Sequence, residues 1–134
     1  MLQLSKKVEY ALIALRHMAM NSHGHVFTAK EIAMKYDISY EFLAKVLQKL
    51  TKSGIIISTQ GVRGGYTLAK RPDEVHVSHV ISVMEDEKPT IAECYASGGE
   101  DCSIFDACTI RKPLGKVQQN LNLLLEKTTL EQII

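Results

Sequence analysis

Apolar residues recur at every third or fourth position near the start of the chain, which predicts an amphipathic helix there. Ser5 stands where it can cap the first turn, and the pattern continues to Met20. A polar stretch at 21–25 then interrupts it. The apolar positions of this first helix are Val8, Leu12, Leu15 and Ala19.

Two shorter helices follow, joined by a tight turn. Thr28 and Glu31 have the spacing of a capping box, in which each side chain accepts a hydrogen bond from the other residue's backbone amide. A turn at 36–38 leads to Ser39, which can cap the second helix, and Gly54 suits the left-handed position at its end. This pair is typical of a helix-turn-helix motif. The second helix has one apolar face, made of Leu43, Val46, Leu47 and Leu50.

The other face of the second helix is polar and carries three lysines against one glutamate. Taken alone, it fits a helical hairpin with a solvated basic face as well as a DNA-reading helix. A hairpin directly behind it favours DNA: segments 55–59 and 66–68 predict strands, and the stretch 60–65 between them is glycine-rich and contains Arg63. Glycine lets backbone approach a phosphate closely, and arginine can enter a narrow minor groove.

The rest of the chain is organised differently. Pro72 marks a boundary, and apolar spacing predicts a helix over 77–84. Residues 90–109 are polar, and a final helix is predicted from about 111 to 127. A small winged core offers too little surface to cover that helix, so we expect pairing with a second copy; folding back on its own domain is the alternative. Its near-heptad stripe consists of Leu114, Val117, Leu121, Leu124 and Leu125.

Charge is divided along the 134 residues. Residues 1–72 hold 11 Lys and Arg against 4 Asp and Glu, a net charge of +7, whereas residues 73–134 hold 5 against 11, a net charge of −6. The basic half predicts a polyanionic partner for that half alone. A hydrophobic content of 46% is enough for a packed core. We find no secretory signal or membrane span and expect a cytoplasmic protein without membrane contact.

These patterns predict a mainly α fold with a small β-wing. Residues 1–72 would form a winged helix-turn-helix DNA-binding domain, and 73–134 would supply a sensor loop at 90–109 and a long C-terminal dimerisation helix at about 111–127. The expected ligand is double-stranded DNA with a palindromic operator, bound by a homodimer. The predicted DNA contacts are Thr28, Ser39, Tyr40, Lys45, Gln48, Lys49, Gly61, Arg63, Gly64, Gly65 and Tyr66.

All three cysteines, Cys94, Cys102 and Cys108, fall within 15 residues. Three thiols in a reducing cytosol do not form a disulfide framework, and thiolate is a soft ligand that suits iron–sulfur clusters, zinc or copper(I). A zinc site would need a fourth ligand, for which His76 or His79 would have to fold across. Unligated thiols acting as a redox switch are the other alternative.

Four stretches resemble the Rrf2-type winged-helix regulators, which include the IscR, NsrR and RirA branches. They are 4–12, 38–43, 63–68 and the cysteine loop that leads into the last helix. The resemblance spans nearly the whole chain. It implies a dimer in which the long C-terminal helices cross and each cysteine loop lies near the first helix of the other copy.

The resemblance also implies an iron–sulfur cluster on Cys94, Cys102 and Cys108, 4Fe–4S being favoured and 2Fe–2S possible. The first gap is seven residues, where many relatives have five, which is closer to the RirA branch. Where the IscR branch has a histidine ligand this chain has Arg111, which cannot ligate. The NsrR branch uses a carboxylate from the partner's first helix, and Glu9 stands at that position; the alternative for Glu9 is a first-turn acid favoured by the helix dipole.

We therefore expect a transcriptional repressor, not an enzyme, because the chain offers no grouping of catalytic residues at credible spacing. Its operator affinity would be controlled by an iron–sulfur cluster that senses iron, redox state or nitric oxide. The alternative is a cluster-free winged-helix regulator controlled by thiol oxidation, zinc or a protein partner. Operator preference does not transfer from the IscR branch, because Ala44 stands where that branch has a glutamate.

Overall fold

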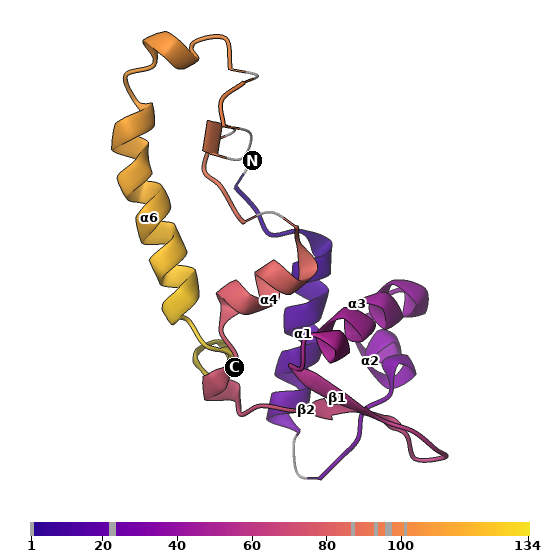
Figure 1. Cartoon of the computed structure of the whole chain (residues 1–134). Helices are drawn as coiled ribbons and strands as arrows, with labels where there is room; N and C mark the ends of the chain where they lie inside the picture. Colours follow the sequence, from indigo (N-terminus) through magenta and orange to yellow (C-terminus); the bar gives the residue numbers. More distant parts are fainter. Residues whose placement is uncertain (1, 22–23, 87, 93, 96–97, 101) are drawn as a thin grey trace.

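The computed structural model describes residues 2–21, 24–86, 88–92, 94–95, 98–100 and 102–134; positions 93, 96–97 and 101 of the predicted sensor loop lie outside the described residues. Most of the chain is helical, with one small antiparallel sheet, as predicted (Figure 1). The elements are α1 (Lys6–Met20), α2 (Ala29–Tyr36), α3 (Tyr40–Lys52), β1 (Ile56–Thr59), β2 (Gly65–Leu68), α4 (Val77–Met84) and α6 (Arg111–Lys127), with short 3-10 turns η1 (Pro72–Glu74), η2 (Phe105–Ala107) and η3 (Leu130–Ile133).

The predicted caps of the first three helices are confirmed. The Ser5 hydroxyl accepts from the Val8 amide at 3.4 Å, and the Ser39 hydroxyl accepts from the Phe42 amide at 3.5 Å. The capping box of α2 is complete, with Glu31 N–H to Thr28 Oγ1 at 3.0 Å and Thr28 N–H to Glu31 Oε2 at 2.9 Å. Such caps satisfy backbone donors that a helix start leaves free.

The predicted apolar face of α3 is buried in full, with Leu43, Leu47 and Leu50 at 0% exposure. In α1 the buried face is turned relative to the prediction, because Leu12 and Ala19 are only half-buried. The small side chains on the buried side allow the neighbouring helices to approach closely, since helix packing distance depends on the side chains at the contact. The buried residues of α1 are Val8, Ala11, Ala14, Leu15 and Met18.

The predicted hairpin is confirmed with small changes at its ends. Strand β1 begins at Ile56 because the Ile55 amide still donates to Leu50 O, at 3.2 Å, to close the end of α3. Strand β2 begins one residue earlier than predicted and pairs Thr59 with Gly65. Backbone hydrogen bonds of 2.9 and 2.6 Å join Phe27 to Tyr66, so the segment before α2 holds the base of the wing.

The hydrophobic core continues past residue 72. Helix α4 packs against α1 and α3. It buries the four apolar residues whose spacing predicted this helix, Val77, Val80, Ile81 and Met84. Leu130, which lies after α6, joins the same core and donates its amide to Val75 O at 2.8 Å. The division at residue 72 therefore stays a prediction about function, because the packing runs across it.

Helix α6 has the predicted bounds and runs along one side of the molecule, next to α4 (Figure 1). Among the residues that the structure describes, only one edge of its apolar stripe is covered. Leu114, Leu121 and Leu125 are half-buried, whereas Val117 and Leu124 on the other edge are 51% and 62% exposed. None of the helices in the described part of the chain is long and apolar enough to cross a membrane.

A histidine near the end of α1 is packed among aromatic rings. The Nδ1 atom of His17 lies 2.7 Å from the Tyr36 hydroxyl, and its ring meets Phe27 edge to face at 5.0 Å. Partial burial lowers the pKa of His17 below its ordinary value of 6.5, and the nearby Lys35 ammonium lowers it further. Neutral His17 thus joins the ends of α1 and α2 to the base of the wing.

Because the folded protein resists protonation of His17, it loses stability as the pH falls below 6.5 toward the lowered pKa, while above 6.5 this contribution is fully present. We predict that a His17→Gln variant shows a smaller drop in Tm than the wild type between about pH 7.5 and about pH 5. The exposed residue His79 provides the control, His79→Gln. An equal drop in Tm for the wild type and His17→Gln would contradict the prediction.

Candidate functional site

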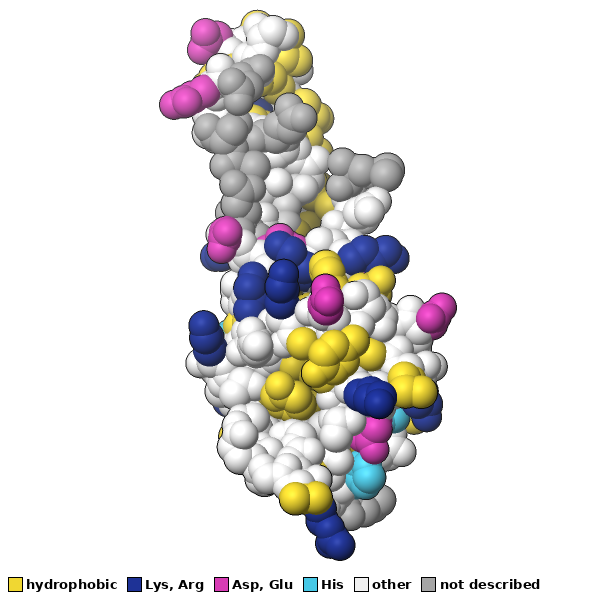
Figure 2. Space-filling view, turned by 90° about the vertical axis from the view of Figure 1, so that its right-hand side faces the viewer, with side chains coloured by type: hydrophobic (Ala, Val, Ile, Leu, Met, Phe, Trp, Pro, Cys, Tyr) yellow, Lys and Arg dark blue, Asp and Glu magenta, His cyan; other side chains and the backbone are white. Residues whose placement is uncertain are grey.

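The polar face of α3 is exposed because the opposite, apolar face of the helix is buried in the core. Tyr40 stands at the start of the helix, and Lys45, Gln48 and Lys49 follow along its outer side, all of them exposed. Figure 2 views the molecule from the side that bears α3 and the wing tip in Figure 1, and Lys and Arg side chains gather on that face around apolar ones. The face is basic and unobstructed, as duplex DNA requires.

The wing tip projects from the same side of the molecule (Figure 1). The Gly64 amide donates to Gly61 O at 3.0 Å and closes the turn, and Gly61 has a φ of 111°. Arg63 is exposed at this tip. A side chain at Gly64 would place its Cβ 2.4 Å from Thr59 O, so this glycine is required by the turn itself.

The predicted DNA contacts fall into two groups. The first group is exposed and consists of Thr28, Ser39, Tyr40, Lys45, Gln48, Lys49, Gly61 and Arg63. Gly64, Gly65 and Tyr66 are half-buried and hold the wing together; a Cβ on Gly65 would lie 2.5 Å from Phe27 O. The structure thus places these three residues behind the exposed tip.

The three cysteines lie at separate points of the loop. Cys94 is in a helical turn beside Tyr95, Cys102 accepts a backbone hydrogen bond from Phe105 at 3.2 Å, and Cys108 follows η2. All three are free and half-buried. Within the described ranges, no three His, Cys, Asp or Glu side chains lie close enough together to hold a metal ion.

The donor chemistry of the loop fits an iron–sulfur cluster, although this conformation does not gather the donors. Three partly accessible thiols are soft ligands, and Gly98 and Gly99, with φ of 75° and 86°, give the loop its tight bends. Arg111 lies 4.0 Å over the Phe105 ring. His76, the residue before α4, forms an isolated antiparallel backbone bridge with Thr129. Both His76 and His79 are exposed.

Glu9, the predicted fourth ligand, lies in the first turn of α1 and is half-buried. Its carboxylate pairs with the Lys6 ammonium at 2.7 Å. A salt bridge at this exposure is weak, so the carboxylate can exchange this partner for another at little cost.

Gln118 of α6 anchors the start of the cysteine loop, a role that we did not predict. Its amide donates to Pro89 O and its carbonyl accepts from the Ile91 amide, both at 2.9 Å. The Gln118 amide also donates to Asn122 Oδ1 at 2.9 Å. Among the described residues, Gln118 is the one polar residue that is buried. The available signal was a glutamine on the covered edge of the apolar stripe, between Leu114 and Leu121.

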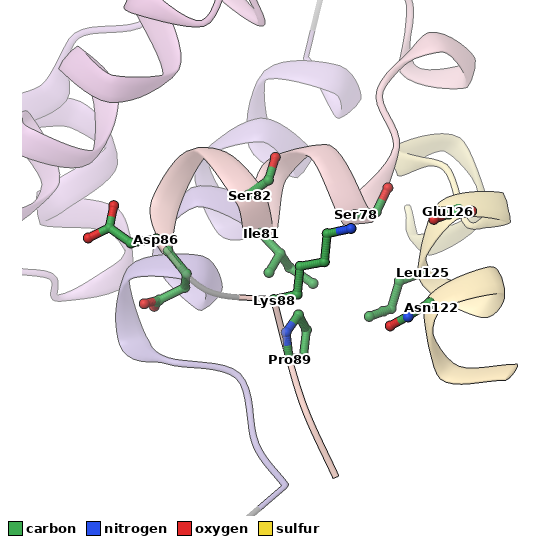
Figure 3. A pocket seen from close by; sticks show the side chains of 10 residues that line it. Ser78, Ile81, Ser82, Asp86, Lys88, Pro89, Asn122, Leu125 and Glu126 are labelled. Carbon is green, nitrogen blue, oxygen red and sulfur yellow. The ribbon is translucent and has the colours of Figure 1, made fainter. Parts of the chain in front are cut away.

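A second tie lies closer to the cysteines, where the Tyr95 hydroxyl donates to Arg111 O at the start of α6. A pocket of about 190 Å³ lies between α4, the segment that follows α4 and the second half of α6. Figure 3 shows Ile81 of α4 and Leu125 of α6 on its two sides, with Pro89 beside them. Helix α6 buries Gln118 alone among its residues, whereas α3 buries four apolar residues, so α6 has the smaller share of core contacts.

Residues 4–134 match the sequence profile of the Rrf2 family, described as iron-dependent transcriptional regulators. The HTH-type transcriptional regulator NsrR of Oceanobacillus iheyensis is 33% identical over 133 residues, which cover 99% of this chain and 90% of that protein. A putative HTH-type transcriptional regulator of Aquifex aeolicus is 42% identical over 82 residues, which cover 61% of this chain and 56% of that protein. These relatives are regulators and not enzymes, as predicted.

Solved structures confirm the winged-helix fold. CymR, the global cysteine regulator of B. subtilis, superposes with a TM-score of 0.78 at 24% identity, covering 99% of this chain and 96% of that one. T. potens IscR superposes with a TM-score of 0.70 at 24% identity, covering 98% and 85%. At these identities the likeness concerns the fold alone.

We predict that Gln118→Leu loosens the cysteine loop, because it leaves the Pro89 carbonyl and the Ile91 amide without partners, at a cost of about 1–3 kcal/mol each if they stay buried. The measurement is amide hydrogen exchange of residues 88–109. Gln119→Leu is the matched control, since Gln119 is exposed and adjacent. Equal exchange in the two variants would show that Gln118 does not anchor the loop.

Proposed function

Because the chain belongs to the Rrf2 family of transcriptional regulators, we propose that it is a cytoplasmic repressor that binds a palindromic operator as a homodimer. The observation that carries this proposal is the exposed basic face of α3 beside a glycine-turned wing with Arg63 at its tip. An α-helix is about 10–12 Å across with its side chains, and the major groove is about 12 Å wide.

The exposed residues divide by the kind of contact that they can make. Ser39 and Tyr40 can approach base edges, because residues near the start of a recognition helix lie deepest in the groove. Gln48 lies on the outer side of the same helix and carries an amide that can bond the edge of an adenine. Lys45 and Lys49 are point charges suited to phosphates, which fix position without reading sequence. Arg63, which is exposed at the wing tip, would enter the adjacent minor groove, where narrow width raises the negative potential.

Dimerisation is supported by the uncovered edge of α6. Val117 and Leu124 lie one heptad apart and are more than half exposed, together with Ile110 one heptad earlier. Apolar residues at heptad spacing bury one another when two helices pair. A two-fold dimer presents two α3 helices and two wings, so its operator has two half-sites about one helical turn apart or a multiple of it.

The cysteine loop is the proposed sensor. Cys94, Cys102 and Cys108 would hold an iron–sulfur cluster, 4Fe–4S by preference and 2Fe–2S as the other form, with Glu9 of the partner subunit as fourth ligand. When bound, such a cluster supplies iron that is sensitive to oxygen, nitric oxide or iron scarcity. The three thiols do not form a metal-binding group in this conformation, so holding one cluster would require the loop to rearrange.

Closure of the loop can reach α3 through contacts in the chain itself. The loop is tied to α6 by Gln118, and the segment after α6 donates and accepts backbone hydrogen bonds with residues 75–77 at the start of α4. Helix α4 shares its core with α3. Ligand control of DNA affinity requires contacts that differ between two states, and in this proposal the difference would pass along these contacts.

We predict that Arg63→Ala lowers both operator affinity and selectivity, because Arg63 responds to groove shape. Lys49→Ala should weaken operator and unrelated duplexes alike and lower the slope of log affinity against log salt by about 0.9 for each lost phosphate contact. Fluorescence anisotropy at several salt concentrations measures both. Lys127→Ala removes an exposed charge far from α3 and serves as control; if all three variants behave alike, the placement of the interface is wrong.

Anaerobic purification should yield a coloured protein containing iron and sulfide, and Cys94→Ala should lose the chromophore and change operator affinity. Ser103→Ala, an exposed substitution in the same loop, should keep both. Absorption spectra, iron and sulfide analysis and anisotropy provide the readouts. A colourless, iron-free protein with three reactive thiols would contradict the cluster proposal. The alternative, a cluster-free regulator controlled by thiol oxidation, zinc or a protein partner, would then be favoured.

A further inference from the structure

A pocket of about 200 Å³ opens where α1, α3 and α4 meet. Three lysines line it, Lys7 from α1 and Lys45 and Lys49 from α3. All three are exposed, and they surround the less accessible side chains of Phe42, Val46 and Met84. The basic surface of α3 therefore continues onto α1, which lies outside the helix-turn-helix motif and the wing.

The position of Lys7 is fixed by an aromatic contact. Tyr10 lies one helical turn after Lys7, so both side chains point to the same side of α1. Tyr10 packs edge to face on Phe42 of α3, with ring centroids 5.3 Å apart and an interplanar angle of 87°. Phe42 in turn lies one turn before Lys45 and lines the same pocket. This contact brings the α1 and α3 lysines to one site.

The positive charge of this site is not balanced within the described part of the chain. None of the three lysines forms a salt bridge there, whereas the neighbouring Lys6 pairs with Glu9 at 2.7 Å. Glu85, the residue after Met84, is hydrogen-bonded to Ser5 and lines the pocket beside α6 instead. Three like charges around one pocket repel each other, and a bound anion relieves that repulsion.

We infer that Lys7, Lys45 and Lys49 together bind a backbone phosphate of the DNA, on the groove wall beside α3. This inference rests on the proposed function. A helix nearly as wide as the major groove brings its edges against the flanking phosphates. Lys45 and Lys49 lie one turn apart along one edge of α3. Lys7 of α1 extends this row of positive charges beyond the helix. The site adds affinity and register without reading sequence.

The test compares Lys7→Gln with Lys6→Gln in the full-length protein, with the same metal state throughout. Loss of one phosphate contact lowers the salt slope by about 0.9, so a dimer that loses two should show a slope lower by about 1.8. The affinities for operator and unrelated duplexes should fall by the same factor. Lys6→Gln should leave the slope unchanged, because Lys6 does not line the pocket. Both residues are exposed, and equal Tm values confirm intact folding.

An unchanged slope in Lys7→Gln, or an equal change in Lys6→Gln, would overturn the inference while leaving salt-sensitive binding by the wild type intact. If the wild type itself shows no such binding, the proposed function fails instead. Inorganic phosphate distinguishes a free anion from DNA. Stabilisation by phosphate beyond that of chloride at equal ionic strength, lost in Lys7→Gln with an unchanged DNA slope, would assign the pocket to a free anion and overturn the inference.

Discussion

Helix α3 is held by a single hydrophobic core that also includes α1, α4 and the chain end after α6. Leu47 and Leu50 of α3 and Val80 of α4 are fully buried in it, and Leu130 joins from beyond α6. Burying a leucine contributes about 1.5–3 kcal/mol, so no one of these helices shifts independently of the others. In the proposed mechanism, a change that reaches α4 from the cysteine loop would pass through this core to α3.

The same packing explains the division of charge. Because α3 buries all its leucines on one side, its lysines face outward beside the wing and, through the Tyr10–Phe42 contact, beside Lys7. The acidic half of the sequence includes the loop and α6, which run along the other side of the molecule (Figure 1). In the proposed complex, negatively charged DNA would meet the basic part alone, and the cysteine loop would lie away from the DNA.

Local rules were enough for much of this structure. The caps at Ser5, Thr28 and Ser39, the buried face of α3 and the bounds of α6 follow from residues within one or two turns, and each was predicted. The buried face of α1 was predicted only in part: Val8 and Leu15 are buried, but Leu12 and Ala19 are not, because close packing of the α1 alanines depends on neighbours distant in sequence. Gln118 and Lys7 acquire their roles only where α6 meets the loop and α1 meets α3. The described residues hold no group of three metal-binding side chains, so the joint role proposed for the cysteines depends on a change that sequence spacing does not describe.

The most direct measurement is the mass and affinity of the complex that the full-length protein forms with a palindromic duplex over a series of salt concentrations. The account predicts two chains per duplex and an affinity that falls linearly with salt on logarithmic axes. A protein without salt-sensitive affinity for double-stranded DNA in any metal state would contradict it.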